Sequence, residues 1–328
     1  MRESHSDTAL NVLFSASFAL NIAGNSIICY TILHKRSLRT TMNILFVNLS
    51  IADMTVGLFM SPWFIFIKLF QHPTGNPGLM LCTFLTGQTL MLCGGVVSFC
   101  TLLSISIERY YAIIHPHSYK GRLSTRKVRI IIILSWVFGI LWVVPQMLTR
   151  KYSEEKQFCV GDWPKRWHVI AYSICWLLIA FVIPVCIMAA IYLRIINALW
   201  RTGNKTVNIC QRVRMRSRKR LTKIMIAITI IYCCCWAPVT IFYCVSSFVS
   251  TMQAGSLWHK VGILMVTLNS SINPVLYSYQ SNQLKIHIKK TMKNLLCCFI
   301  KRGRVDVVRE CQPRAFVGNN STLTTRLT

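Results

Sequence analysis

Seven long apolar segments constrain this chain more than any other feature of its sequence. A helix that crosses a bilayer needs about 20 consecutive, mostly apolar residues. Stretches of that kind run over 8–33, 43–70, 79–112, 127–148, 167–199, 218–249 and 257–279. Because lipid offers no partners to backbone polar groups, we expect each stretch to be an α-helix. The prediction is an all-α integral membrane protein, a bundle of seven transmembrane helices.

Positive charge is concentrated between alternate apolar segments. The 328 residues include 37 Lys and Arg against 9 Asp and Glu, a net charge of +28 that on a soluble protein would suggest nucleic acid as a partner. Of these basic residues, eight fall on one side of the predicted bundle and 29 on the other, in 34–43, 109–130, 194–223 and the tail from 280. The positive-inside rule then places the N-terminus outside and the C-terminus in the cytoplasm. The charge thus predicts orientation and contact with membrane lipids, and we expect no nucleic-acid partner.

Two of the fifteen cysteines stand apart because they lie in or beside predicted outer loops. An oxidising exterior favours a disulfide between these two, Cys82 and Cys159. Cys297 and Cys298 follow a basic amphipathic stretch at the predicted inner membrane face. We expect palmitoylation there, with ordinary interfacial thiols as the alternative.

Asp53 is the only acid well inside a predicted span. A carboxylate at that depth needs partners or a water-filled cavity. Polar residues lie at comparable depths of other spans: Asn25, Ser98, Asn269, Ser270 and Asn273. They predict either a hydrogen-bond network that holds helices together or a site for a monovalent cation, and the two are compatible.

Short motifs follow one another along the spans in a recognisable order. They are Gly24-Asn25, Asn48 to Asp53, Glu108-Arg109-Tyr110, Trp136 with Pro145, Pro184 with Tyr192, Cys235-Trp236-Ala237-Pro238 and Asn273-Pro274-Val275-Leu276-Tyr277. Together they resemble the rhodopsin-like G-protein-coupled receptors over nearly the whole chain, nearest to the peptide-receptor branch.

The resemblance implies a receptor domain over 1–295, with a short amphipathic membrane-surface helix at 281–295, and a flexible cytoplasmic tail at 296–328. It implies a multi-pass plasma-membrane receptor that binds an extracellular ligand and activates a heterotrimeric G protein. The basic stretch 200–223 is expected to contact G protein or arrestin as well as anionic lipid. The resemblance implies no enzyme activity and no cofactor apart from an allosteric Na⁺.

The same resemblance implies roles for individual residues. Those matching the sodium pocket are Asp53, Ser98, Asn269, Ser270 and Asn273, beside Trp236, which also matches the floor of the ligand pocket. Those matching the G-protein coupling region are Glu108, Arg109, Tyr110, Tyr192, Asn273, Pro274 and Tyr277.

Two departures from the family pattern stand out. Cys82 and Arg109 are 27 residues apart, two more than is usual, so either the third helix bulges or Cys82 pairs from a different position. Arg218 occupies a position where many relatives carry an acid, so we expect no ionic lock between it and Arg109.

Residue identities narrow the class of ligand. Opsins need a lysine where this chain has Thr267, and aminergic receptors need an aspartate where it has Met91. The expected pocket residues are Trp63, Gln88, Met91, Leu92, Trp176, Trp236, Tyr243, His259 and Ile263. A short peptide is the favoured ligand, a lipid or other small molecule comes next, and a receptor without a natural ligand stays open.

Other classes of membrane protein fit less well. A transporter would carry charged residues along a pathway or an internal repeat. A membrane enzyme would show a metal-binding or nucleophile cluster, and none is visible in the sequence. A receptor-like protein that does not signal remains an alternative, although Arg109, Tyr192, Asn273 and Tyr277 are all present.

Overall fold

The computed structural model describes most of the membrane domain. The described residues are 5–61, 65, 72–115, 123–154, 158–202, 209–249, 256–279 and 283–293. The chain divides into one large unit, Met1–Ile288, and a second, Lys289–Thr328. The predicted tail 296–328 and the predicted palmitoylation sites Cys297 and Cys298 lie outside the described residues.

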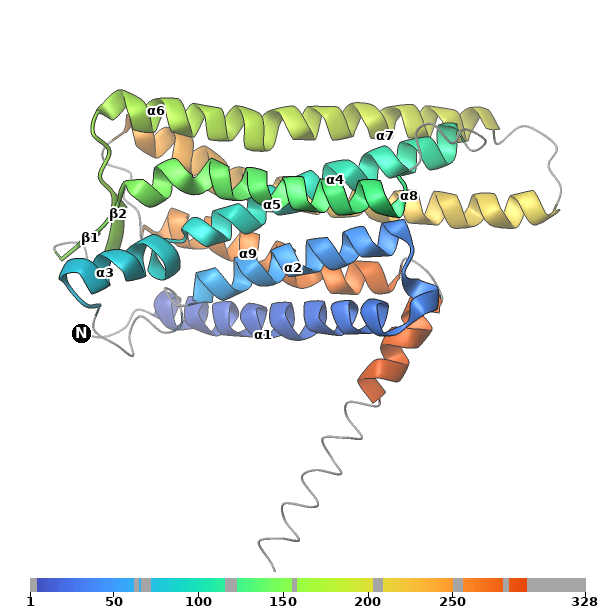
Figure 1. Ribbon diagram of the computed structural model, residues 1–328, viewed down its shortest axis with the longest axis horizontal. Helices are drawn as coiled ribbons and strands as arrows, with labels where there is room; N and C mark the ends of the chain where they lie inside the picture. The colour runs from blue at the N-terminus through green and yellow to red at the C-terminus, as the bar shows by residue number, and fades with distance from the viewer. Residues whose placement is uncertain are drawn as a thin grey trace, which may run out of the picture. The chain divides into compact units, whose positions relative to one another are not determined.

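Seven helical segments form the bundle of the large unit (Figure 1). Four are single helices along most of their length: α1 (His5–His34), α2 (Thr41–Ser61), α5 (Thr125–Leu148) and α9 (Leu257–Ser278). The sixth span is also a single helix, α8 (Ile209–Phe248), which begins nine residues before the expected start at 218. The basic residues 212–220 are good helix formers, so the helix continues beyond the apolar stretch.

The third and fifth spans are compound. The third consists of α3 (Gly75–Leu81), a π-helical turn η4 (Cys82–Thr86) and α4 (Thr89–Ile114). The fifth consists of α6 (Arg166–Cys175), a π-helical turn η5 (Trp176–Val182) and α7 (Ile183–Thr202). Pro184, which cannot donate a backbone hydrogen bond, is the second residue of α7 and lies two residues beyond the end of η5.

Six of these segments are long and apolar enough to cross a membrane by composition, counting the described residues alone. They are Thr8–His34, Thr41–Ser61, Gly75–Ile114, Thr125–Leu148, Arg166–Leu199 and Lys219–Phe248. The helix α9 is not among them, because buried Asn269, Ser270, Ser271 and Asn273 reduce its apolar character. Its polar residues face the bundle, so the seventh span is recognised by packing rather than by composition.

Side-chain caps set where two of the helices begin. The Ser124 hydroxyl accepts a hydrogen bond from the backbone N–H of Lys127 at the start of α5 (3.3 Å). At the start of α9, the Ser256 hydroxyl accepts one from the N–H of His259 (3.4 Å). Each satisfies a donor that the first helical turn leaves unpaired.

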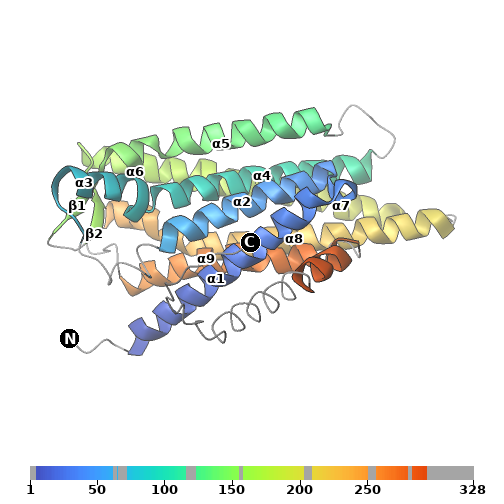
Figure 2. The same ribbon diagram turned by 60° about the horizontal axis from the view of Figure 1, so that its bottom comes forward.

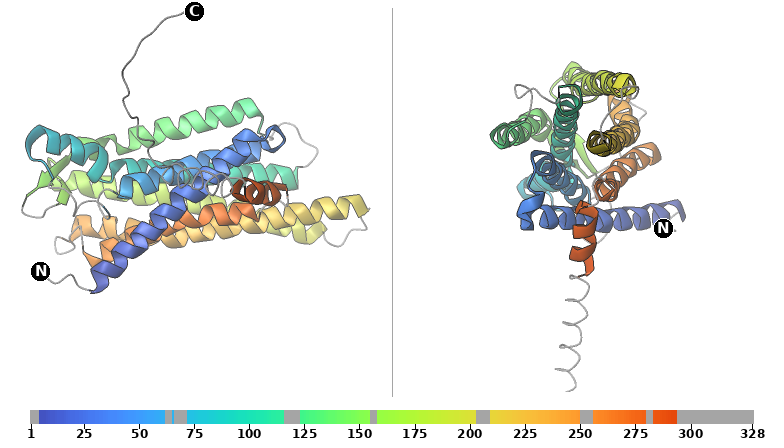
Figure 3. Two further views of the ribbon diagram at one scale, coloured as in Figure 1. Left: turned by 90° about the horizontal axis from the view of Figure 1, so that it is seen from below. Right: turned by 90° about the vertical axis from the view of Figure 1, so that its right-hand side faces the viewer.

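The helix α2 lies at the centre of the packing. It packs against α1, α4 and α9, and Figure 2 shows α2 and α4 side by side along the bundle. The Asn48 side chain joins three helices, since its Nδ2 donates to Thr101 Oγ1 (2.8 Å) and its Oδ1 accepts from Trp136 Nε1 (3.0 Å). The end-on view in Figure 3 shows the helices surrounding this shared interior.

A small β hairpin is the one non-helical element with regular structure in the described part of the chain. Strand β1 (Arg150–Ser153) pairs antiparallel with β2 (Phe158–Gly161), with Arg150 opposite Gly161 and Tyr152 opposite Cys159. The hairpin lies at the end of the bundle where α1 begins (Figure 1).

Residues 283–293 are helical, as expected for the amphipathic helix predicted over 281–295. Leu284 and Ile288, one helical turn apart, are buried in the hydrophobic core. Residues 281–282 and 294–295 lie outside the described part.

Candidate functional site

A cavity of about 520 Å³ lies at the hairpin end of the bundle. Its walls come from α4, α5, α6, η5, α8 and α9, and from both strands of the hairpin. Cavities of roughly 300–1,000 Å³ are typical of sites that enclose a drug-sized molecule. The space therefore suits a small molecule or the end of a peptide.

The structure brings most of the expected pocket residues together on this cavity. The eight that line it are Gln88, Met91, Leu92, Trp176, Trp236, Tyr243, His259 and Ile263. The ninth, Trp63, lies outside the described residues.

The expected pocket residues did not include the part of the wall contributed by the hairpin, by the start of α6 and by further positions of α5 and α8. These lining residues are Gln146, Arg150, Cys159, Val160, Gly161, Asp162, Trp163, Arg166, Val169, Val239, Thr240, Phe242, Ser246 and Ser247. Helical periodicity says nothing about where a loop folds. The predicted disulfide was the available signal, because tethering Cys159 to the third span brings its neighbours in β2 to the helix ends.

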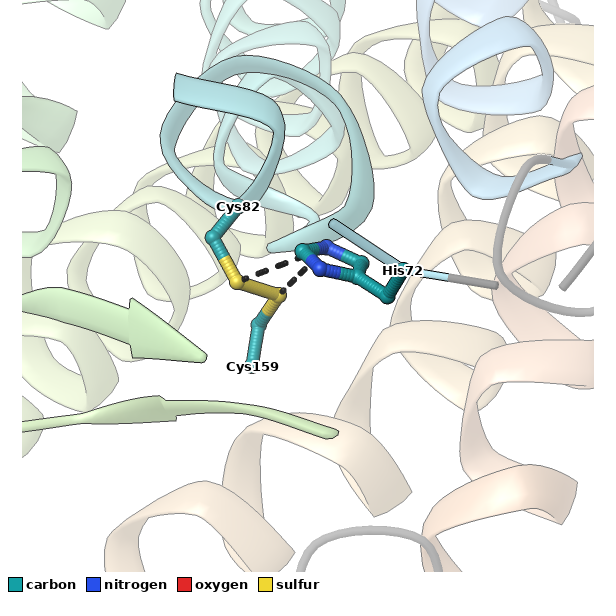
Figure 4. Close-up of side chains that lie close together, drawn as sticks. All are labelled: His72, Cys82 and Cys159. Carbon is teal, nitrogen blue, oxygen red and sulfur yellow. Dashed lines mark hydrogen bonds between the residues drawn. A yellow bond between two sulfur atoms is a disulfide. The ribbon is translucent and has the colours of Figure 1, made fainter. Parts of the chain in front are cut away.

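The predicted disulfide between Cys82 and Cys159 is present, with Cα atoms 5.7 Å apart (Figure 4). It ties β2 to the start of η4. The backbone N–H of Asp162 also donates to the carbonyl of Thr149 (2.6 Å), which closes the base of the hairpin. The hairpin is therefore held at both its base and its second strand.

His72 packs against this disulfide. Its Nε2 lies 3.9 Å from each sulfur and 3.1 Å from Thr86 Oγ1, and its ring stacks on Tyr152 with centroids 3.9 Å apart. Cysteine binds metals as a thiolate. Both sulfurs are bonded to each other, so the trio of His72, Cys82 and Cys159 seals the hairpin and is no metal site.

The unusual spacing between Cys82 and Arg109 is explained by a bulge. The π-helical turn η4 runs from Cys82 to Thr86, and Gln88 then adopts a left-handed conformation with φ +62°. Gln88 is the only residue other than glycine with positive φ in the described part of the chain. The two extra residues are absorbed here, which places Gln88 on the cavity wall.

Trp236 closes the cavity at its deep end and is 3% exposed. Its ring stacks with that of Tyr232 at a centroid distance of 5.6 Å. On α4, a Cβ at Gly95 would overlap the far edge of the Trp236 ring. The position of Trp236 thus depends on a glycine in the facing helix.

Charged side chains lie on the wall near the hairpin. Nη1 of Arg150 donates to the carbonyl of Cys159 (3.3 Å). Burial lowers the pKa of the Arg150 guanidinium from its usual value, and the nearby Tyr243 and Tyr172 side chains oppose that shift. The carboxylate of Asp162 pairs instead with the Lys151 ammonium.

A polar cluster lies deeper in the bundle around Asp53, which is fully buried. Asn273 Nδ2 donates to Asp53 Oδ2 (2.8 Å), and Asn21 Nδ2 donates to the Asp53 backbone carbonyl (2.9 Å). The Ser98 and Ser270 hydroxyls also lie close to the carboxyl group. The structure therefore brings all five expected sodium-site residues into buried positions, with Asn269 in the same stretch of α9.

Buried oxygen atoms of this cluster lack a hydrogen-bond partner among the described residues. They include Asn21 Oδ1, Asn25 Oδ1, Asp53 Oδ1, Ser98 Oγ, Asn269 Oδ1, Ser270 Oγ and Asn273 Oδ1. Unpaired buried acceptors are costly, so the cluster has the composition of a site for water or for a hard cation.

The opposite end of the bundle is closed around Arg109, which is 9% exposed. One guanidinium nitrogen lies 3.8 Å from Glu108 Oε1, and Glu108 Oε2 accepts from the backbone N–H of Leu123 (3.3 Å). The Tyr192 hydroxyl lies 3.2 Å from Thr229 Oγ1 on α8. The first contacts join α4 to the segment before α5, and the last joins the fifth span to the sixth.

The other expected coupling residues lie along the same interior. The Tyr277 ring is fully buried and packs on Phe46 with centroids 4.7 Å apart. Pro274 packs against Gly24, where an added Cβ would lie 3.0 Å from the proline ring. Tyr110 is partly buried and meets Tyr111 edge-on. Asn273 instead belongs to the Asp53 cluster.

The sequence matches a known family over most of the membrane domain. Residues 24–277 match the profile described as "7 transmembrane receptor (rhodopsin family)". The chain belongs to this family. It is therefore a multi-pass membrane receptor built as a seven-helix bundle, and not an enzyme.

The receptor is similar to several peptide receptors. A tachykinin-like peptides receptor of Drosophila melanogaster is 27% identical over 310 residues, covering 88% of this chain and 58% of that receptor's length. A QRFP-like peptide receptor of Branchiostoma floridae is 27% identical over 311 residues, covering 90% and 79% of the two chains. Human galanin receptor type 1 is 24% identical over 299 residues, covering 89% and 82%.

The two positions used to narrow the ligand class have ordinary structural partners in this receptor. Thr267 is buried and donates its hydroxyl to the Ile263 carbonyl (3.0 Å). Met91 is buried on the cavity wall. Neither position offers the covalent or ionic anchor that retinal or an amine requires.

Proposed function

We propose that this receptor binds a short extracellular peptide in the cavity at the hairpin end and activates a heterotrimeric G protein at the Arg109 end. One observation carries the proposal: an open cavity walled by a disulfide-anchored hairpin lies at one end, while Arg109 is enclosed at the other. The relatives named above, all receptors for peptides, support a peptide as ligand.

The orientation belongs to the same proposal. The disulfide favours an oxidising exterior for the hairpin end, and 29 of the 37 basic residues fall in sequence segments on the other side of the predicted spans. The N-terminus is then extracellular and the C-terminus cytoplasmic, with the receptor in the plasma membrane.

The proposed switch links two sets of contacts. Trp236 lies between the cavity and the Asp53 cluster, and its position depends on packing against Gly95. A ligand that binds better when Trp236 has shifted favours the state in which α8 moves away from α4. The contact between Tyr192 and Thr229 then breaks, and Arg109 becomes available to a G protein.

The Asp53 cluster supplies a candidate allosteric site for Na⁺. Asp53, Ser98, Asn269, Ser270 and Asn273 would hold the ion through oxygen atoms, which is the chemistry a hard cation prefers. A bound Na⁺ would neutralise the buried carboxylate and stabilise the closed state.

Arrestin and anionic lipids are proposed partners of the basic inner end. Arg216 and Arg220 are exposed near the start of α8. Each basic side chain close to an anionic leaflet contributes about 1 kcal/mol of attraction. The same surface offers charge to the acidic segments of a protein partner.

A nucleotide-exchange assay tests the function. Membranes containing the receptor are mixed with purified G-protein heterotrimers and screened with peptide and lipid libraries. The proposal expects a peptide to stimulate exchange. Stimulation by lipids alone would show that the ligand is a lipid and not a peptide. Failure of every library, with an Asp53→Asn variant also silent, would instead favour a receptor-like protein that does not signal.

A further inference from the structure

Arg150 is a cation on the cavity wall that has no acidic partner among the described residues. It occupies the first position of β1, opposite Gly161. The aliphatic part of its side chain packs beside Gly87, where an added Cβ would lie 3.4 Å from Arg150 Cδ. The bulge in the third span, which places Gly87 and Gln88, thus also leaves room for this arginine.

The contacts of Arg150 do not use its capacity to bind an anion. Nη1 donates to one backbone carbonyl, that of Cys159 (3.3 Å). Nε is enclosed and has no hydrogen-bond partner among the described residues. A guanidinium carries five N–H donors in a planar fork that fits a carboxylate. Arg150 is half-buried with its Nε enclosed, and enclosing a charge without an acid beside it is costly, so a structural role alone explains it poorly.

Other charged residues on the wall have partners elsewhere. Among the described residues that line the cavity, Asp162 is the only acid, and its carboxylate is paired with Lys151. Arg166 Nη2 also donates to a backbone carbonyl, that of Phe248 (2.7 Å), but Arg166 is exposed, so water screens its charge. Arg150 is therefore the lining cation that a ligand would have to neutralise.

The unpaired polar atoms on the wall favour a ligand rich in acceptors. Four lining residues have a buried polar atom without a partner in the described structure: Gln88 Nε2, Gln146 Oε1, Arg150 Nε and Trp236 Nε1. Arginine and tryptophan nitrogens can only donate, whereas a side-chain amide can turn to offer either function. Nitrogens that can only donate hydrogen bonds thus lie unpaired at both the hairpin side of the cavity (Arg150) and its deep end (Trp236).

Tyr243 adds a second group near Arg150. Its side chain lies close enough to interact electrostatically with the guanidinium, as does that of Tyr172. The Tyr172 hydroxyl donates to the Trp142 carbonyl (3.0 Å). The Tyr243 hydroxyl makes no hydrogen bond to a described residue, so it can donate to the group that Arg150 binds.

We infer that the ligand carries an anionic group of the carboxylate type, and that Arg150, with Tyr243 beside it, anchors this group. The inference rests on the proposed function, because it assumes that the cavity is the ligand site. A peptide can supply the carboxylate at its C-terminus or on an acidic side chain. A small carboxylic acid carries the same chemistry.

Matched synthetic probes test this inference on the purified, full-length receptor. One tetrapeptide library is made as C-terminal acids and again as C-terminal amides. A second pair of libraries contains glutamate or glutamine at a fixed position. A third pair contains small carboxylic acids and their amides. Binding is measured as a rise in the apparent melting temperature, and affinities are then determined for the strongest probes.

The expected result is a preference for carboxylates that depends on Arg150. We expect acid probes to bind and their amide partners to bind much more weakly. We expect Arg150→Gln to weaken the best acid probe about thirtyfold or more, since it removes one partner of an enclosed charge pair. Lys165→Gln is the matched control, because it removes an exposed cation that follows the hairpin and does not line the cavity. The affinity of this control variant for the best acid probe should stay close to that of the wild type.

A charge-reversal variant distinguishes a lost anchor from a misfolded receptor. Arg150→Glu should reverse the preference, so that peptides ending in an aminoethyl amide bind better than the corresponding acids. A misfolded receptor would not gain affinity for a new probe.

The remaining outcomes separate the two proposals. If peptide amides bind as well as acids, or if Arg150→Gln retains full affinity, the carboxylate anchor is wrong while the peptide receptor stands. If only small carboxylic acids bind, and they require Arg150, the anchor stands and the peptide ligand is wrong. If no anionic probe binds in any arm, the anchor is overturned.

Discussion

At the scale of single residues, Gly95 fixes where Trp236 can lie. A Cβ at this position would overlap atoms at the far edge of the indole ring. We expect Gly95→Ala to displace Trp236 and to destabilise the closed state by about 1–3 kcal/mol, as overpacking does elsewhere. The apparent melting temperature of the purified receptor should fall.

Two further variants check the cause of that effect. Gly262→Ala is the milder control, because its Cβ would lie 3.3 Å from Val239, tight but without overlap. Trp236→Phe removes the ring atoms that clash, so Gly95→Ala should cost less in that background. Equal losses in both backgrounds would show that the glycine does not act through Trp236.

Asp53 gives a second prediction at this scale. Its carboxylate and the surrounding unpaired oxygen atoms form the proposed sodium site. Replacing choline chloride by sodium chloride at constant ionic strength should raise the melting temperature of the wild type. Asp53→Asn, which keeps the shape and removes the charge, should abolish the rise. An equal sodium effect in both proteins would contradict the assignment.

The sequence alone was informative about residues inside the spans. Polar residues inside an apolar helix need hydrogen-bond partners or a functional role, which is why Asp53 and Asn273 stand out in the sequence. Trp236 stands out as a bulky aromatic residue in the motif of the sixth span. Arg150 was not among the expected pocket residues, because in sequence it is one of several charged residues in an outer loop. Only the pairing of β1 with β2 shows that Arg150 lines the cavity while Lys151 is exposed.

At the scale of elements, the junction between η4 and α4 is the most unusual. Gln88 adopts φ +62°, a conformation that costs a residue with a Cβ about 1–2 kcal/mol. We compare Gln88→Gly with Gln88→Ala, since both remove the amide and only alanine keeps the Cβ. The glycine variant should be the more stable by roughly 1 kcal/mol, measured from melting temperatures. A more stable alanine variant would mean that the left-handed conformation is absent from the folded receptor.

The positions of the helices were predictable from apolar length, and their internal breaks were not. The expected span 127–148 lies within α5, Thr125–Leu148, because hydrophobic length sets the helix. Span length does not encode the π-helical turns η4 and η5, which interrupt the third and fifth spans. The spacing between Cys82 and Arg109 indicated that something differed in the third span, and the structure supplies the bulge.

At the scale of the whole molecule, the distribution of charge predicts orientation. In the sequence, 29 of the 37 basic residues fall in 34–43, 109–130, 194–223 and the tail from 280, none of which contains the hairpin. An epitope tag at the N-terminus should therefore bind antibody on intact cells, and a tag at the C-terminus should do so only after permeabilisation. A tag on a cytosolic protein controls for membrane leakage. The opposite pattern would invert the proposed topology and place the cavity inside the cell.

The central claim is that occupation of the cavity opens the Arg109 end. The direct measurement is the distance between spin labels at Arg126 on α5 and Arg216 on α8, both exposed near that end, with and without a peptide found by the exchange screen. A second pair, Arg126 and Arg36, serves as the reference, because neither lies on α8. The account predicts that peptide increases the distance to Arg216 and leaves the reference distance unchanged. A bound peptide that changes neither distance would contradict it.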